Sequence, residues 1–332
     1  KWRVVLDPLP AGGPHKIVVE GKNRIAIEDV LVGEVWVCSG QSNMAWPVVV
    51  TYAADLARLT ANYPQLRMIT VPRIGTQEPQ DDFEGTWELS SPDSVDHFSA
   101  VGYFFGRVLH QVLGIPIGLI HDSWGGSACE AWVPRPLLED DPQYKPLVDR
   151  WVKIEKAGTN QAQLRGNARP GNLYNGMLHP VIGYGIRGAI WYQGESNASR
   201  AYQYRHLFPL MIKSWRDAWQ QGEFSFYWVQ LADFKQETSE PTDSAWAELR
   251  EAQTMTLSLP KTGQAVIIDI GESNDIHPRN KEDVGERLAR CALAKDYGID
   301  IAYRGPEFKS MKRKDSVLLI TFDHTDGGLM SF

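Results

Sequence analysis

The feature that most constrains this chain is an alternation of short apolar runs with stretches in which apolar residues recur at helical spacing. Such an alternation is typical of a parallel β-sheet that helices cover on both faces. We therefore predict an α/β fold with a parallel sheet at its centre. The predicted strands span residues 35–38, 117–120, 189–192, 224–231 and 265–270.

The two ends of the chain follow a different pattern. The first thirty residues alternate apolar and polar positions and are broken by Gly, Pro and Asn, which is typical of hairpins and includes a predicted strand at residues 2–6. Another strand is predicted at residues 315–322. Because a few short strands cannot cover their own apolar faces, we expect partial β-rich accessory segments at residues 1–30 and 301–332. They would flank a central domain at residues 31–300, and the last would be the start of a truncated domain.

Composition excludes some function classes. The 332 residues carry a net charge of −7, so we expect no nucleic-acid partner. No apolar run approaches the roughly 20 residues of a membrane helix, so no membrane insertion is expected. Residues 1–7 lack the apolar core of a signal peptide, which leaves either a cytoplasmic protein or one whose leader is absent from this sequence. The cysteines Cys38, Cys129 and Cys291 are predicted to be buried thiols.

Polar, glycine-containing loops follow four of the predicted strands. Because ligands of an open parallel sheet bind outside the carboxyl ends of its strands, these loops are expected to form one site. The loops occupy residues 39–44, 121–127, 193–197 and 271–278.

Within these loops, Ser42 and His277 fit acyl transfer. Ser42 lies at the turn into a helix, where backbone N–H groups point toward developing negative charge, although a serine there is more often a cap. His277 is the best general base, and Asp275, two residues earlier, would face the same way in an extended segment. His121 remains a competing base, since it also lies at a strand end. No histidine lies among carboxylates at metal-ligand spacing, so we expect no metal and no cofactor.

Further residues of the loops offer contacts to an oxyanion or a substrate. Gly125 and Gly126 let the backbone approach a substrate closely, or simply form a tight turn. Gln193 offers a side-chain amide donor, with Asn197 as a second candidate. Glu195 would hold His277, contact the substrate or form a buried hydrogen-bonded link.

Four motifs in order resemble the sialate O-acetylesterase-like branch of the SGNH hydrolases, which several acetylxylan esterases share. Gly-Gln-Ser-Asn-Met at residues 40–44 is similar to its nucleophile block and Ser-Trp-Gly-Gly at 123–126 to its oxyanion block. Trp-Tyr-Gln-Gly-Glu-Ser-Asn at 191–197 resembles its third block, and Asp-Ile-His-Pro at 275–278 its terminal block. The resemblance covers about residues 30–300.

The resemblance implies a flavodoxin-like SGNH hydrolase, with a three-layer α/β/α sandwich, that acts as a carbohydrate O-acetylesterase. It implies a serine esterase with an O-acetylated carbohydrate as its partner, sialic acid O-acetyl groups as the substrate, a Ser–His–Asp acyl-enzyme mechanism, and a periplasmic or secreted address. The oligomeric state stays open. One alternative is an acetylxylan or other plant-glycan acetylesterase with the same catalytic residues. A second is a non-catalytic carbohydrate-binding protein.

Two positions depart from the broader SGNH pattern. Gln193 stands where many SGNH enzymes have an Asn. The common spacing of the final acid would fall on Asn274, so we assign that role to Asp275 and keep Glu195 in reserve.

Overall fold

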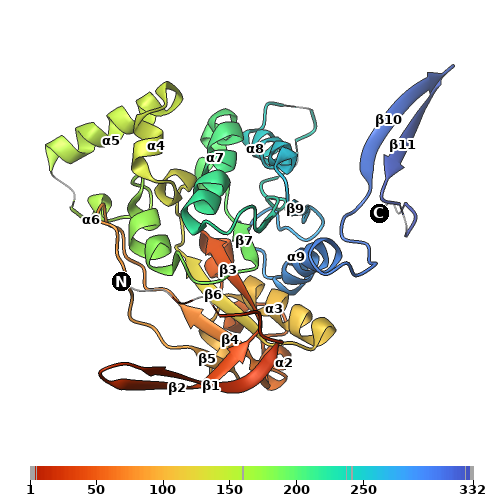
Figure 1. The fold of residues 1–332 in the computed structure, drawn as a ribbon. Helices are drawn as coiled ribbons and strands as arrows, with labels where there is room; N and C mark the ends of the chain where they lie inside the picture. The colour runs from red at the N-terminus through yellow and green to blue at the C-terminus, as the bar shows by residue number, and fades with distance from the viewer. Residues whose placement is uncertain are drawn as a thin grey trace.

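The computed structural model describes residues 4, 6–158, 161–236, 238–240, 242–325 and 327–329. At its centre lies a seven-stranded sheet in the order β5-β4-β6-β3-β7-β8-β9 (Figure 1). All neighbouring strands pair in parallel except β5, which is antiparallel to β4. The strands are β3 (Glu34–Gly40), β4 (Tyr63–Thr70), β5 (Glu88–Ser90), β6 (Ile117–Ser123), β7 (Gly188–Tyr192), β8 (Ser225–Val229) and β9 (Thr262–Ala265).

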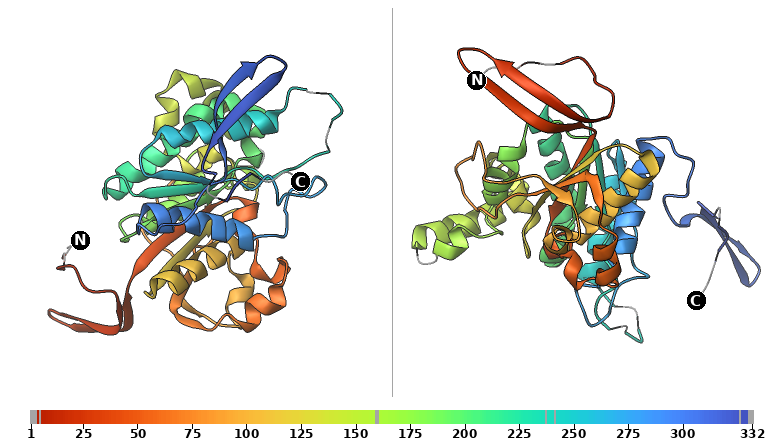
Figure 2. Two further views of the ribbon diagram at one scale, coloured as in Figure 1. Left: turned by 90° about the vertical axis from the view of Figure 1, so that its right-hand side faces the viewer. Right: turned by 90° about the horizontal axis from the view of Figure 1, so that it is seen from below.

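Helices cover the sheet on both faces, which confirms the predicted α/β fold. On one face α3 (Ala100–Leu113) packs against α9 (Glu282–Lys295), and Trp36 of β3 meets Phe105 of α3 edge-on. On the other face, Trp191 of β7 meets Trp215 of α7 (Ala201–Trp219), which packs against α8 (Ala245–Met255) (Figures 1 and 2). Because both faces are covered, β7 and β8 are buried along their whole length.

The remaining helices lie in the connections between strands of the central sheet. They include the π-helical turn η5 (Tyr174–Leu178), and the 3-10 turns are η1 (Val48–Val50), η2 (Val95–His97), η3 (Cys129–Trp132), η4 (Pro142–Tyr144), η6 (His179–Val181), η7 (Glu195–Arg200) and η8 (Thr256–Ser258). The α-helices are α1 (Ser42–Ala45), α2 (Ala54–Leu59), α4 (Arg135–Glu139), α5 (Lys145–Ala157) and α6 (Gln161–Leu164).

The sheet differs from the predicted one at its edges. The strand predicted at residues 265–270 is wrong, because the strand is β9 and the apolar residues after it form a loop in which Val266 and Ile268 are 40% and 51% exposed. The sequence analysis also missed β4 and β5. β5 is the strand at the opposite edge and has only three residues, whereas β4 lies between β5 and β6 and is buried at only some of its positions.

Two antiparallel hairpins lie outside the main sheet. One is β1 (Gly12–Glu20) with β2 (Arg24–Val32), and the other is β10 (Glu307–Lys314) with β11 (Val317–Asp323), which projects away from the body in Figure 1. These hairpins agree with the β-rich ends expected from sequence, whereas the division at residues 30 and 300 stays a prediction. The strand predicted at 2–6 falls mostly outside the described residues, and Val4 and Leu6 are not in a strand.

Two other predictions concern cysteines and membranes. Cys38, Cys129 and Cys291 are free and buried, as predicted. Among the described residues, no helix combines the length and the apolar character needed to cross a membrane.

Candidate active site

The loops after three central strands meet at one edge of the sheet. Strand register places Gly40, the last residue of β3, opposite Ser123 of β6 and Tyr192 of β7. Gly40 has a φ of +139°, and a Cβ there would lie 2.2 Å from the carbonyl oxygen of Tyr192. Only glycine fits such a close approach, so the chain turns sharply from β3 into α1 at this point.

This turn presents Ser42 to a histidine far away in the sequence. Ser42 is the first residue of α1, and its Oγ lies 2.8 Å from Nε2 of His277, 235 residues later. That distance is within hydrogen-bond reach of a nucleophile and its general base. The structure therefore brings together the two residues predicted to be nucleophile and base.

The surroundings of His277 favour the neutral form of its imidazole. The indole of Trp46 stacks on the ring, with 5.0 Å between centroids and 15° between planes. Burial lowers the pKa of His277 below its ordinary value of 6.5, the nearby Lys281 lowers it further, and Asp275 opposes them by raising it. A neutral imidazole can accept a proton, so these shifts favour the form that a general base needs.

Asp275 contacts the backbone of His277. The carboxylate is exposed, and its Oδ1 accepts a 2.8 Å hydrogen bond from the backbone N–H of His277. Among the described residues, no hydrogen bond joins a carboxylate to the imidazole of His277. Asp275 thus fixes the loop and places a negative charge near the ring, while its role as triad acid stays a prediction.

Gly125 and Gly126 lie beside the nucleophile. A Cβ on Gly125 would stand 3.5 Å from Cβ of Ser42, and in the described part of the chain the Gly125 N–H donates to no acceptor. Asn167 Nδ2 donates to the Gly125 carbonyl at 2.5 Å. Gly126 has a φ of +73°, and its carbonyl accepts from Ser196 Oγ at 3.0 Å. The loop is held by its carbonyls, which leaves the Gly125 N–H available for an oxyanion.

The two predicted amide donors are not free. Gln193 is fully buried, and its Nε2 donates to the Ser127 carbonyl at 3.1 Å and to Asn197 Oδ1 at 2.7 Å. Asn197 is also buried; its Oδ1 accepts from the backbone N–H of Cys129, and its Nδ2 donates to Glu130 at 2.9 Å. These amides connect the loop after β7 to residues 127–130, which follow the two glycines. A role as oxyanion donors would require them to leave these partners.

The competing base His121 has a different neighbour. Its Nε2 lies 2.6 Å from Ser123 Oγ, and the imidazole is buried inside the domain. Burial, with Arg73 nearby, lowers the pKa of His121 to about 3. Ser42 is therefore paired with His277 and not with His121.

Sequence reasoning missed three polar residues around the pair. Asn43 and Lys281 lie beneath His277 with the predicted Glu195, and Asn167 holds the oxyanion loop. Asn43 follows the nucleophile directly and Lys281 lies four residues after the base, so proximity in sequence was the available signal. It was too common a signal to distinguish them from surface residues.

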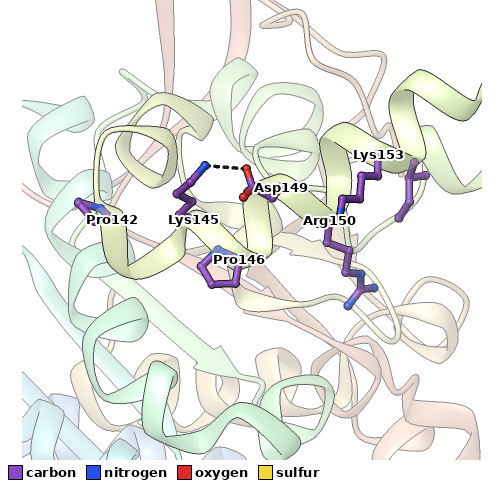
Figure 3. Close-up of a pocket in the computed structure, with 7 residues that line it drawn as sticks. Pro142, Lys145, Pro146, Asp149, Arg150 and Lys153 are labelled. Atoms are coloured by element: carbon purple, nitrogen blue, oxygen red, sulfur yellow. Dashed lines mark hydrogen bonds and ion pairs between the residues drawn. The ribbon is translucent and has the colours of Figure 1, made fainter.

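A hollow elsewhere on the surface takes no part in this site. It lies along α5, where Lys145 pairs with Asp149 at 3.0 Å and Arg150 and Lys153 project beside them (Figure 3). None of the predicted catalytic or substrate residues lines it.

Comparison with known proteins identifies the family of this chain. The family described as "Carbohydrate esterase, sialic acid-specific acetylesterase" matches residues 32–294. The chain is 31% identical to the sialate O-acetylesterase of Mus musculus over 97% of its own length and 69% of that protein. With the Homo sapiens sialate O-acetylesterase it shares 32% identity over 92% of this chain and 62% of the relative.

A solved structure agrees at the level of the fold and the sequence. A carbohydrate acetylesterase from Xanthomonas citri superimposes with a TM-score of 0.82 at 41% identity, over 95% of this chain and 69% of that one. The chain therefore belongs to the sialic acid-specific acetylesterase family of carbohydrate esterases.

Proposed function

We propose that this protein removes O-acetyl groups from sialic acids through an acyl-enzyme formed on Ser42. The observation that carries the proposal is the 2.8 Å contact between Ser42 Oγ and His277 Nε2, beside the N–H of Gly125, which has no acceptor among the described residues. The names of the curated relatives support sialic acid as the sugar.

In the first half of the reaction, Ser42 Oγ attacks the acetyl carbonyl while His277 Nε2 takes the hydroxyl proton. The resulting oxyanion accepts hydrogen bonds from the backbone N–H groups of Ser42 and Gly125, which lie at the helix start and on the adjacent loop. His277 then passes its proton to the sugar oxygen as the C–O bond to the acetyl carbon breaks. The sugar leaves with a free hydroxyl, and Ser42 carries the acetyl group.

In the second half, water attacks the acetyl-enzyme. His277 Nε2 accepts a proton from the water, and Ser42 Oγ takes that proton as the ester bond breaks, which releases acetate. Asp275 supplies the negative charge that stabilises the imidazolium in both halves, because it raises the pKa of His277. Its hydrogen bond to the backbone N–H of His277 holds the loop while the ring changes charge.

The test is acetate release from two matched panels, O-acetylated sialic acids and acetylated xylo-oligosaccharides, with an activated acetyl ester as reference. We expect release from the sialic acids, and a loss of on the order of 10⁴–10⁶ in kcat for Ser42→Ala with an unchanged thermal unfolding midpoint. Release from xylo-oligosaccharides alone moves the substrate to plant glycans. Full activity in Ser42→Ala rejects the nucleophile, and sugar binding without any release identifies a non-catalytic binding protein.

A periplasmic or secreted address is part of the same proposal, because the resemblance to the sialate O-acetylesterase-like family implies it. Fractionation of cells that express the natural full-length protein tests it. Recovery in the cytoplasmic fraction alone contradicts it.

A further inference from the structure

A buried lysine lies beneath the catalytic histidine. Lys281 immediately precedes α9 and is fully buried. Its Nζ donates to Asn43 Oδ1 at 2.7 Å and to the carbonyl of Pro278 at 2.5 Å. The rings of Trp46 and Tyr192 cover the ammonium, each with its centroid 5.7 Å from Nζ. Burying a cation is costly, so its hydrogen-bond partners indicate what the charge does.

Asn43 connects this lysine to a buried carboxylate. Its Nδ2 donates to Glu195 Oε1 at 2.7 Å and to the carbonyl of Ile276 at 2.9 Å. Among the described residues, Lys281 and Glu195 form no direct ion pair, so the Asn43 amide bridges the two charges. The second oxygen of Glu195, Oε2, is buried and has no hydrogen-bond partner in the described chain.

These contacts hold the backbone on both sides of the general base. Asn43 fixes the carbonyl of Ile276, and Lys281 fixes that of Pro278, the residues on either side of His277. Asn43 also follows Ser42 in α1, so one side chain connects the nucleophile turn to the histidine loop. The hydrogen bonds of Lys281, Asn43 and Glu195 thus hold the backbone around the 2.8 Å contact between Ser42 and His277, although none of the three side chains takes part in that contact.

We propose that Lys281 is a positioning residue for this esterase: with Asn43 and Glu195, it clamps the carbonyls that flank His277 and holds the imidazole against Ser42. This inference rests on the proposed serine-esterase chemistry. Lys281 touches no reacting atom, so it acts through His277.

The charge of Lys281 gives the clamp a second effect. Burial lowers the pKa of Lys281 to about 7, whereas Glu195, Asp275 and Glu272 raise it. Below pH 7 the ammonium is therefore present, and its repulsion contributes to the lowered pKa of His277, which Asp275 on the same loop opposes. From β7, Tyr192 presents only a neutral ring to this group. Removing the cation should raise the pKa of His277.

The main test is Lys281→Met, which keeps a long apolar stem and removes the donor and the charge. We expect kcat for an activated acetyl ester to fall about 10²-fold, because a displacement of about 1 Å in a reacting group costs that much. KM should change by less than about 3-fold, since substrate contacts remain. The acid limb of kcat/KM should move to higher pH, because a base with a raised pKa is protonated up to a higher pH.

Loss of the lysine leaves the buried carboxylate of Glu195 without a nearby positive charge, which could destabilise the fold. A second variant therefore separates loss of stability from loss of positioning. Lys281→Met combined with Glu195→Gln removes both charges and should regain thermal stability without regaining kcat. Arg216→Met is the matched control. Arg216 is also a buried cation, and it donates to the carbonyls of Phe224 and Pro260, which lie just before β8 and β9, at the amino ends of the strands and away from the site. It should lower the unfolding midpoint and leave kcat and the acid limb unchanged.

Labelling of Ser42 by a fluorophosphonate, followed by mass spectrometry, separates this inference from the proposed function. The expected result is rapid labelling of the wild type and labelling about 10²-fold slower in Lys281→Met. Rapid wild-type labelling without acetate release from any ester rejects the proposed function and leaves the clamp standing. Wild-type kcat and labelling in a folded Lys281→Met overturn the clamp, as does a change confined to KM or to stability. Absence of labelling in the wild type overturns both.

Discussion

Two serine–histidine pairs lie near the same edge of the sheet, His277 with Ser42 and His121 with Ser123. Their Nε2–Oγ distances are similar, 2.8 Å and 2.6 Å. The first pair joins the start of α1 to the loop after β9 and is partly exposed, whereas the second lies two residues apart on one strand and is buried.

The difference shows that proximity of a serine and a histidine does not make a nucleophile. His121 packs against Phe98 and has its pKa lowered to about 3, and its strand neighbour Asp122 is a buried acid whose pKa is raised. A substrate has no access to such a pair, and an imidazolium there would be strongly disfavoured. The outer pair combines access, an unpaired backbone N–H at Gly125 and charges of both signs around the imidazole.

The largest expected effect is loss of the outer base. His277→Ala should lower kcat by on the order of 10⁴–10⁶, because Ser42 then has no group to take its proton. The partly exposed side chain contributes little to the core, so the thermal unfolding midpoint should stay close to the wild-type value. Steady-state hydrolysis of an activated acetyl ester checks this, and a loss below tenfold would mean that another residue activates Ser42.

Removal of the charge beside that base should be the next largest effect. Asp275→Asn should lower kcat by on the order of 10²–10⁴, since the imidazolium loses its stabilising carboxylate. Its pH profile should move as well: without Asp275 the pKa of His277 falls, so the acid limb shifts to lower pH. Glu195→Gln, measured in parallel, is the matched variant. If it causes the greater loss and also moves the acid limb to lower pH, the triad acid is Glu195.

The two histidines should also differ in their pH behaviour. Because the pKa of His277 is lowered, its neutral form persists below pH 6.5, and activity should decline only as the pH falls through that lowered pKa. His121 stays neutral down to about pH 3 in the folded protein, so it adds no step to the profile between pH 5 and 8. A profile of kcat/KM between pH 4 and 9 checks this, and an acid limb centred above pH 6.5 contradicts it.

The smallest effect on activity should come from the inner pair. Ser123→Ala removes the hydroxyl that contacts His121 and should change kcat by less than about 3-fold, since Ser42 and Gly125 keep their positions. It should lower the free energy of unfolding by about 1–3 kcal/mol, because a buried ring nitrogen loses its partner. Chemical denaturation measures that loss. A large fall in kcat with unchanged stability would assign Ser123 a catalytic role.

Much of the fold could be predicted from the sequence because the central strands are buried on both faces. The apolar runs that became β3, β6, β7 and β8 were identified for that reason. The edges were harder: β4 and β5 were missed, and the apolar residues after β9 were taken for a strand although Ile268 is exposed. At an edge, the neighbours in space decide whether an apolar run becomes a strand.

The candidate site divides in the same way. Ser42, His277 and Gly125 were identified from polar, glycine-containing loops after strands, because the sheet brings the ends of parallel strands to one edge. Gln193 and Asn197 come from an equally polar loop, yet their amides are already hydrogen-bonded to Ser127 and Glu130. Lys281 carried no distinguishing pattern, since a lysine before a helix is ordinarily a surface residue.

The sequence by itself determined the alternation of the central strands with helices, the turn into a helix at Ser42 and the set of polar residues that lie at the carboxyl ends of the strands. Only the tertiary structure decided which of those groups are satisfied and which remain free to react. Hydrogen bonds such as those of Asn43 to Glu195 and to Ile276 join residues 152 and 233 positions apart. Whether a polar group is paired depends on such partners and on the water excluded around them, and both exist only once the chain has folded.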